Sequence, residues 1–102
     1  MESREESMKE KDIEQKFVKA VRNAGGLCWK FVSPGTDGVP DRLALLPEGR
    51  MAFVELKAPG KKPRPLQVKR KRQLEKLGFQ VYVVDNARQI DEILSEIGGD
   101  AR

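Results

Sequence analysis

Two short apolar segments near the middle of the chain, joined by a turn, constrain the fold most. RLALL (42–46) is followed by the turn PEGR and then by RMAFVELKA (50–58). Two apolar runs separated by so short a polar turn predict a β-hairpin. In an antiparallel hairpin the start of the first strand lies beside the end of the second. The sequence therefore predicts that Asp41 lies near Glu55 and Lys57.

A helix and a strand are predicted before the hairpin. Between positions 7 and 24, apolar residues recur at helical spacing, and Ser7 with Glu10 can form a capping box. Glycines at 25 and 26 should end this helix. LCWKFVS (27–33) then has the β-branched and aromatic character of a strand that runs into a loop.

A helix, a buried strand and a last helix are predicted after the hairpin. Pro65 suits the first turn of a helix, which we expect to end at Gly78. FQVYVV (79–84) is typical of a buried strand. Asp85 or Asn86 can cap the last helix. Its apolar stripe consists of Ala87, Ile90, Ile93, Leu94 and Ile97.

This order of elements implies an α/β fold in which helices flank a mixed β-sheet. With 102 residues, neither a repeat nor a long linker is evident, and we expect one domain over 1–102 with flexible ends at 1–6 and 98–102. No apolar run approaches the roughly 20 residues that cross a bilayer, and the N-terminal segment is charged. We expect a cytoplasmic protein without a membrane partner.

The charged residues limit the possible chemistry. The chain has 20 Lys and Arg against 16 Asp and Glu, a net charge of +4 that favours a polyanionic partner. Histidine is absent, which removes the usual general base and the usual nitrogen ligand of zinc. Catalysis would need carboxylates, lysine and a hard cation such as Mg²⁺ or Mn²⁺. The single cysteine, Cys28, is interpreted as a buried apolar residue.

The segment VELK presents a carboxylate and an ammonium together. The pleat places Glu55 and Lys57 on one face of the strand, about 7 Å apart, and the hairpin adds Asp41. Such a cluster suits phosphodiester hydrolysis, because two carboxylates can hold a divalent cation that binds the scissile phosphate and lowers the pKa of a bound water. We hypothesise that Lys57 positions this water or helps to deprotonate it, and the second role requires a lysine pKa low enough to provide the neutral amine.

Three further side chains leave alternatives open. Glu14 lies at the edge of the buried helix face, where it can contact a metal, pair with Lys57 or a backbone amide, or be an amphipathic margin residue. Gln67, in the first turn of its helix, can hold water or a phosphate oxygen, or bond to the backbone. Asp37 is interpreted as a loop former, and the loop glycines allow either a close phosphate approach or tight turning.

A basic segment follows VELK. Between Lys57 and Lys76, Glu75 is the only acidic residue. We predict that this segment binds DNA phosphates beside the catalytic residues. Since no helix-turn-helix or zinc-finger signature is present, we expect recognition of shape. Trp29 alternates with Leu27 and Phe31, which favours core packing over base stacking. The predicted phosphate-binding residues are Lys61, Lys62, Arg64, Lys69, Arg70, Lys71 and Arg72.

The segments GVPD, VELK and PLQ, in this order and spacing, resemble the PD-(D/E)xK nuclease superfamily and, more narrowly, its VRR-Nuc family of stand-alone phage and bacterial nucleases. The resemblance covers nearly the whole chain and implies a restriction-endonuclease-like core. It implies that Asp41, Glu55 and the carbonyl of Leu56 bind the metal, with a contribution from Glu14. Lys57 completes the motif, and Gln67 matches the family's helix glutamine.

The same resemblance implies a structure-selective DNA endonuclease that acts as a homodimer on branched DNA such as Holliday junctions, in a bacterium or a phage-infected cell. We expect no nucleotide cofactor. Two alternatives remain open: a catalytically silent DNA-binding or assembly module with the same fold, and a nuclease for ordinary duplex ends or single strands. The complete set of acidic residues and lysine argues against the first alternative.

Overall fold

The computed structural model describes residues 9–98, so the predicted cap at Ser7, the end segment 1–6 and most of the end segment 98–102 lie outside the described residues. Gly98, the first residue of the latter segment, is the last residue of a helix. The predicted order of helices and strands is confirmed. The elements are α1 (Glu10–Asn23), β1 (Leu27–Lys30), β2 (Arg42–Leu46), η1 (Pro47–Gly49), β3 (Arg50–Leu56), α2 (Pro65–Lys76), β4 (Val81–Val84), η2 (Ala87–Gln89) and α3 (Ile90–Gly98).

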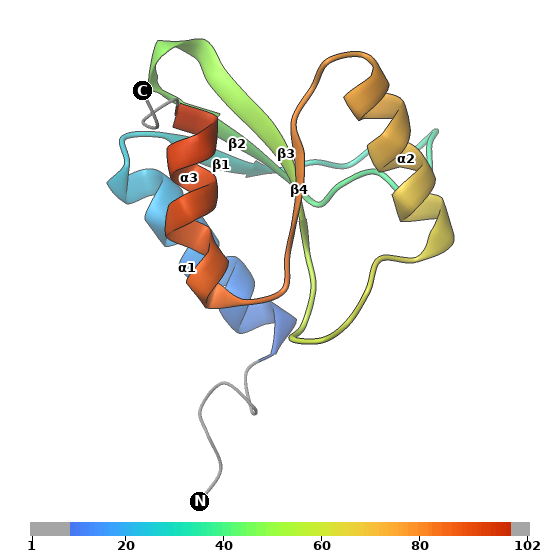
Figure 1. Ribbon diagram of the computed structural model, residues 1–102, viewed down its shortest axis with the longest axis horizontal. Coiled ribbons are helices and arrows are strands. Elements are labelled where there is room, and N and C mark those ends of the chain that lie inside the picture. The colour runs from blue at the N-terminus through green and yellow to red at the C-terminus, as the bar shows by residue number, and fades with distance from the viewer. Residues whose placement is uncertain (1–8, 99–102) are drawn as a thin grey trace, which may run out of the picture.

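The four strands form one mixed sheet in the order β1-β2-β3-β4. The pairs β1–β2 and β2–β3 are antiparallel, whereas β4 runs parallel to β3. A parallel pair needs a crossover connection, and α2 supplies it. Helices α1 and α3 lie on one side of the sheet and α2 lies on the other (Figure 1). The predicted α/β class with a mixed sheet is therefore confirmed.

The main core lies between the sheet and the helices α1 and α3. Ile13, Phe17 and Val21 recur one turn apart on α1 and are completely buried. Alternate residues of the strands meet them, because side chains i and i+2 share a face of a sheet. The strand residues of this core are Cys28, Ala44, Leu46, Ala52, Val54, Leu56 and Val84, and α3 adds Ile90, Ile93 and Ile97. The predicted burial of Cys28 and the predicted apolar stripe of α3 are thus confirmed.

The opposite face of the sheet is only partly covered. Helix α2 lies over the β4 side of this face, and on β1 the side chains of Leu27 and Trp29 remain 51% and 56% exposed. The prediction that Trp29 is a core residue is therefore wrong. Its alternation with Leu27 was interpreted correctly, but no helix among residues 9–98 covers that face at β1.

Three strands are shorter than predicted, and one of these, β3, ends at Leu56 instead of at residue 58. β1 ends at Lys30, after which the amide of Phe31 still donates to the carbonyl of Asp41 at 2.8 Å. β4 begins at Val81, because the amide of Phe79 donates instead to the carbonyl of Leu74 at the end of α2. The ends of the strands are thus set by the neighbouring loop and helix.

Helix starts follow local side-chain bonds. At the start of α1, the amide of Lys9 donates to Oδ2 of Asp12 at 2.9 Å. Before α3, Oδ1 of Asn86 accepts from the amide of Arg88 at 2.8 Å, which confirms Asn86 as the predicted cap. Within residues 9–98, no helix combines the length and the apolar character needed to span a membrane.

Candidate active site

Asp41 is fixed where the hairpin opens. It directly precedes β2, and its Oδ2 accepts a hydrogen bond from the amide of Leu56 at 2.8 Å. The register pairs Arg42 with Val54, so the preceding residue, Asp41, lies beside the Glu55–Leu56 end of β3. The predicted approach of Asp41 to the end of the second strand is confirmed. The hairpin therefore provides the hydrogen bond that holds this carboxylate.

Glu55 is the charged residue that the fold buries. It projects from β3 on the α2 side of the sheet, between Val54 and Leu56 that point into the main core, and it is 3% exposed. Among the described residues, no donor hydrogen-bonds to either of its carboxylate oxygens. The Nζ of Lys57 lies 3.5 Å from Oε2, an ion-pair contact that is too long for a strong hydrogen bond. A buried carboxylate in this state is costly to the fold.

Burial and then the negative charge of Asp41 raise the pKa of Glu55 to about 7. Lys57 and the side-chain amide of Gln67 act in the opposite direction and lower this pKa, but by less. Desolvation and a like charge both disfavour the carboxylate form, so this carboxyl holds its proton to a higher pH than a solvent-exposed glutamate does. A cation between the two carboxylates would remove both penalties.

Gln67 connects the start of α2 to this cluster. Its Oε1 accepts from the amide of Arg64 at 2.8 Å, which is the backbone-bonding alternative of the sequence analysis. Its side-chain amide is near enough to Glu55 to lower the pKa of that carboxyl, but it does not reach hydrogen-bond geometry with either carboxylate oxygen. The hydrogen bond from the Arg64 amide fixes the side-chain oxygen of Gln67, and it thereby also fixes the direction of the side-chain nitrogen. Contact of Gln67 with a water or a phosphate oxygen stays a prediction.

Glu14 has a partner that the sequence analysis did not consider. Its Oε2 accepts from Nε of Arg42 at 2.9 Å, and the same guanidinium donates to the carbonyl of Cys28 at 3.0 Å. The contact ties α1 to β2 one residue away from Asp41. A possible signal was the alternation on β2, which places Arg42 on the α1 face where a cation needs an anion. A direct role of Glu14 toward a metal stays a prediction.

The donor set at this corner suits a hard cation. In the described part of the chain, no group of three or more Asp, Glu, Cys or His residues is arranged to hold a metal ion. The pair Asp41 and Glu55 remains, with the backbone carbonyl of Leu56 as the third predicted ligand. Magnesium commonly takes one or two carboxylates and completes its coordination with water and phosphate. The two carboxylates fit that requirement, since the oxygens of Glu55 have no hydrogen-bond donor among the described residues.

The loop before Asp41 is fastened to α2. Gly38 has φ +86, and a Cβ there would lie 2.8 Å from Cγ of Leu66. The Nε of Arg70 donates to the carbonyl of Asp37 at 2.7 Å, while Asp37 itself is exposed. The glycine at 38 thus serves a turn and a close approach to the helix. The close approach of a DNA phosphate to this loop stays a prediction.

The seven predicted phosphate-binding residues fall into two groups. Arg70 bonds to the loop and, through a second nitrogen, to Gln73, and Lys71 forms an ion pair with Glu75 at 2.7 Å. These two cations already have partners within the protein. The exposed members of the set are Lys61, Lys62, Arg64, Lys69 and Arg72.

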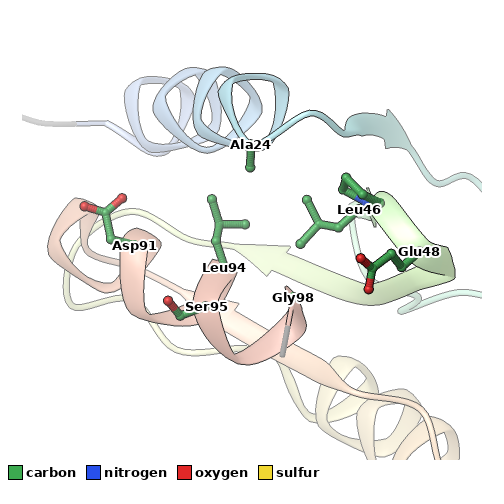
Figure 2. Close-up of a pocket in the computed structure, with 8 residues that line it drawn as sticks. Ala24, Leu46, Glu48, Asp91, Leu94, Ser95 and Gly98 are labelled. Carbon is green, nitrogen blue, oxygen red and sulfur yellow. The ribbon is translucent and has the colours of Figure 1, made fainter. Parts of the chain in front are cut away.

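A separate cavity lies at the other end of the hairpin. It has a volume of about 280 Å³ and lies between the end of α1, the turn at η1 and helix α3 (Figure 2). Glu48 and Asp91 line it, and the predicted site residues do not. This cavity is therefore not part of the candidate active site.

Comparisons with known proteins agree with the fold. No family model matches the chain. Over 79 residues it is 52% identical to a protein of Acyrthosiphon pisum secondary endosymbiont phage 1 named "Putative nuclease p44", and the match covers 78% of this chain and 85% of the relative. It is also similar to a solved structure described as a VRR_NUC domain, with a TM-score of 0.79 and 32% identity over 84% of this chain and 94% of that one. Both matches extend over most of the folded unit.

Proposed function

Because this chain belongs to the VRR-Nuc family of nucleases, we propose that it hydrolyses phosphodiester bonds of DNA with a Mg²⁺ or Mn²⁺ ion at Asp41 and Glu55. One observation carries the metal requirement. Glu55 is 3% exposed, its oxygens have no hydrogen-bond donor among the described residues, and a second carboxylate raises its pKa. A cation at this position is the simplest way to satisfy both carboxylates.

The proposed role of each side chain follows from its position in the site. A bound cation would supply electrophilic activation of the scissile phosphate and of the attacking water. Asp41, fixed by the Leu56 amide, and Glu55, fixed by the strand, are the residues that would hold it. Lys57, 3.5 Å from Glu55, presents its ammonium at the same corner, where it positions the water or the phosphate. The Glu14–Arg42 pair supports Asp41 from the α1 side.

Branched DNA is the proposed substrate. The exposed cations of residues 61–72, which we call the α2 segment, follow directly after the site, so they can bind phosphates on either side of the cut. Phosphate contacts position a nucleic acid without specifying its sequence, and selection by shape is therefore the expected mode. A nuclease for linear ends or single strands is the competing substrate class.

We further propose that two copies associate. The poorly covered face of the sheet exposes Leu27, Trp29 and Phe79, and the end of α2 adds Leu77, which is 74% exposed. Apolar side chains grouped in this way are commonly covered by a partner. A second copy that covers this face would also provide the two-fold symmetry suited to symmetric cutting. Analytical ultracentrifugation of the wild type and of Trp29→Ser tests this, with a dimer expected only for the wild type.

Cleavage assays test the enzymatic proposal. Four-way, flap, nicked and linear DNA at equal concentration would be incubated with Mg²⁺, with Mn²⁺ or with EDTA. We expect products only with metal and most product from branched DNA. Lys57→Met should abolish cleavage, because it removes the ammonium that positions the water or the phosphate. DNA binding in EDTA should stay intact, because the exposed cations of the α2 segment remain. Wild-type protein that retards DNA without cutting it would instead identify a silent binding module.

A further inference from the structure

A second basic surface lies on the α1 side of the sheet. A groove of about 630 Å³ runs between α1 and the strands β1 and β2. Its charged lining consists of Lys11, Glu14, Lys19, Arg22, Lys30 and Arg42. The phosphate-binding segment predicted from the sequence does not include any of these cations.

The groove has an excess of positive charge. Its single carboxylate, Glu14, is paired with Arg42 at 2.9 Å, which leaves four cations without an acidic counterpart in the lining. Lys19 and Arg22 project from successive turns of α1, and Lys30 faces them from β1. All three are exposed. A concave surface lined by one sign of charge attracts a polyanion, and spaced Lys and Arg side chains match the phosphates of a nucleic-acid backbone.

The position of the groove relates it to the active site. Arg42, which lines the groove where it contacts Glu14 of α1, directly follows Asp41 in the chain, and the lining along α1 extends to Arg22. The α2 segment with its own cations lies on the other side of the sheet (Figure 1). The candidate active site thus lies between two positively charged surfaces that the sheet separates.

We propose that this groove binds the sugar-phosphate backbone of a second duplex arm of branched DNA, while the α2 segment binds the first arm. The inference rests on the proposed function and assigns its substrate class to particular residues. A straight duplex placed along α2 leaves the α1 side of the sheet unoccupied. Two arms that diverge at the scissile phosphate can reach both surfaces at once.

Charge reversal in the groove tests this assignment. The variant Lys19→Glu/Arg22→Glu would be compared with Lys16→Glu, a lysine that is exposed on the same helix and does not line the groove. Binding would be measured by fluorescence anisotropy in EDTA, with a four-way junction and with a linear duplex the length of one arm. Thermal melts would verify that the variants fold, and Lys30→Glu would test the groove from the opposite wall.

For the junction we expect the double variant to raise the Kd about tenfold or more and to reduce the slope of log K against log salt by about 2, since each lost phosphate contact contributes about 0.9. The short duplex should lose less than about threefold, because the α2 segment still holds it. Lys16→Glu should change either Kd by less than about twofold.

Equal effects of the double variant and Lys16→Glu on junction binding would overturn the proposal. An equal loss on junction and short duplex would also overturn it, since no second arm would then be involved. Because binding is measured in EDTA, these outcomes are independent of cleavage. A protein that binds junctions through the groove and cuts no DNA would refute the proposed function and leave the groove assignment standing.

Discussion

The two faces of the sheet differ in the kind of residue that they bury. On the face toward α1 and α3, side chains such as Ile13, Phe17 and Val54 are completely buried and apolar. On the face toward α2, Glu55 is buried as a carboxyl without a hydrogen-bond donor among residues 9–98, and Trp29 remains more than half exposed. Most of the packing energy thus comes from one face, and the other face can hold a charged group whose burial is costly. The apolar packing on one face can therefore offset the energetic cost of burying a carboxyl on the other.

The largest expected effect compares the face of the sheet that α1 and α3 cover, here called the closed face, with the partly covered opposite face, here called the open face. Phe17→Ala should destabilise the protein by about 3–5 kcal/mol, because it leaves a cavity in the main core. Trp29→Ala removes a larger side chain from the open face and should cost less than about 1 kcal/mol. Urea unfolding at low protein concentration measures both. Similar losses for the two variants would contradict the proposed difference between the faces.

An intermediate effect concerns the buried carboxyl. The pKa of Glu55 is about 7 in the folded protein and lies near 4.5 in an unperturbed chain. The folded state therefore holds this proton more tightly than the unfolded state, and stability from Glu55 is present below about pH 4.5 and lost as the pH rises through 7. Without metal, the loss between about pH 5 and about pH 8 should reach 2 to 3 kcal/mol at most, and Glu55→Gln should remove it.

Chemical denaturation in EDTA at the two pH values measures this difference. Asp41, Lys57 and Gln67 face the carboxyl and are present in both proteins, so the comparison with Glu55→Gln isolates its proton. A wild-type protein whose stability changes with pH as little as that of Glu55→Gln would show that the site does not strain the carboxylate.

The smallest expected effect concerns the loop that positions Asp41. Gly38→Ala places a methyl group 2.8 Å from Leu66 in a backbone conformation with φ +86, and should cost about 1–2 kcal/mol. Gly35→Ala is the matched control, since its Cβ would meet no atom within 4 Å. Thermal unfolding together with the cleavage rate measures the result. We expect only Gly38→Ala to lower both, because Asp41 follows three residues later.

The part of the site that the sequence predicts is the part set by local rules. The two-residue period of a strand and the short turn at PEGR determine that Glu55 and Lys57 share a face and that Asp41 lies beside them. These rules need no knowledge of distant elements. The hydrogen bond from the Leu56 amide to Asp41 shows that the hairpin register was inferred correctly.

The parts that the sequence does not predict depend on how helices cover the sheet. The partner of Glu14 is Arg42, a residue 28 positions away, and the pairing follows only once α1 is placed against β2. Trp29 is exposed because α2 does not extend over β1. The alternation of residues along β1 does not predict which part of the sheet a helix covers. For Gln67 the sequence offered two roles, and the structure shows the bond to the backbone, whereas contact with a water or a phosphate oxygen stays a prediction.

Manganese binding measured by isothermal titration calorimetry tests the central claim most directly. Wild-type protein should bind the ion, and Glu55→Gln should bind it at least about tenfold more weakly, because one of two carboxylate ligands is lost. Glu48→Gln, an exposed carboxylate in the turn at the other end of the hairpin, should bind as the wild type does. Equal affinity of all three proteins would contradict the assignment of a metal ion to Asp41 and Glu55.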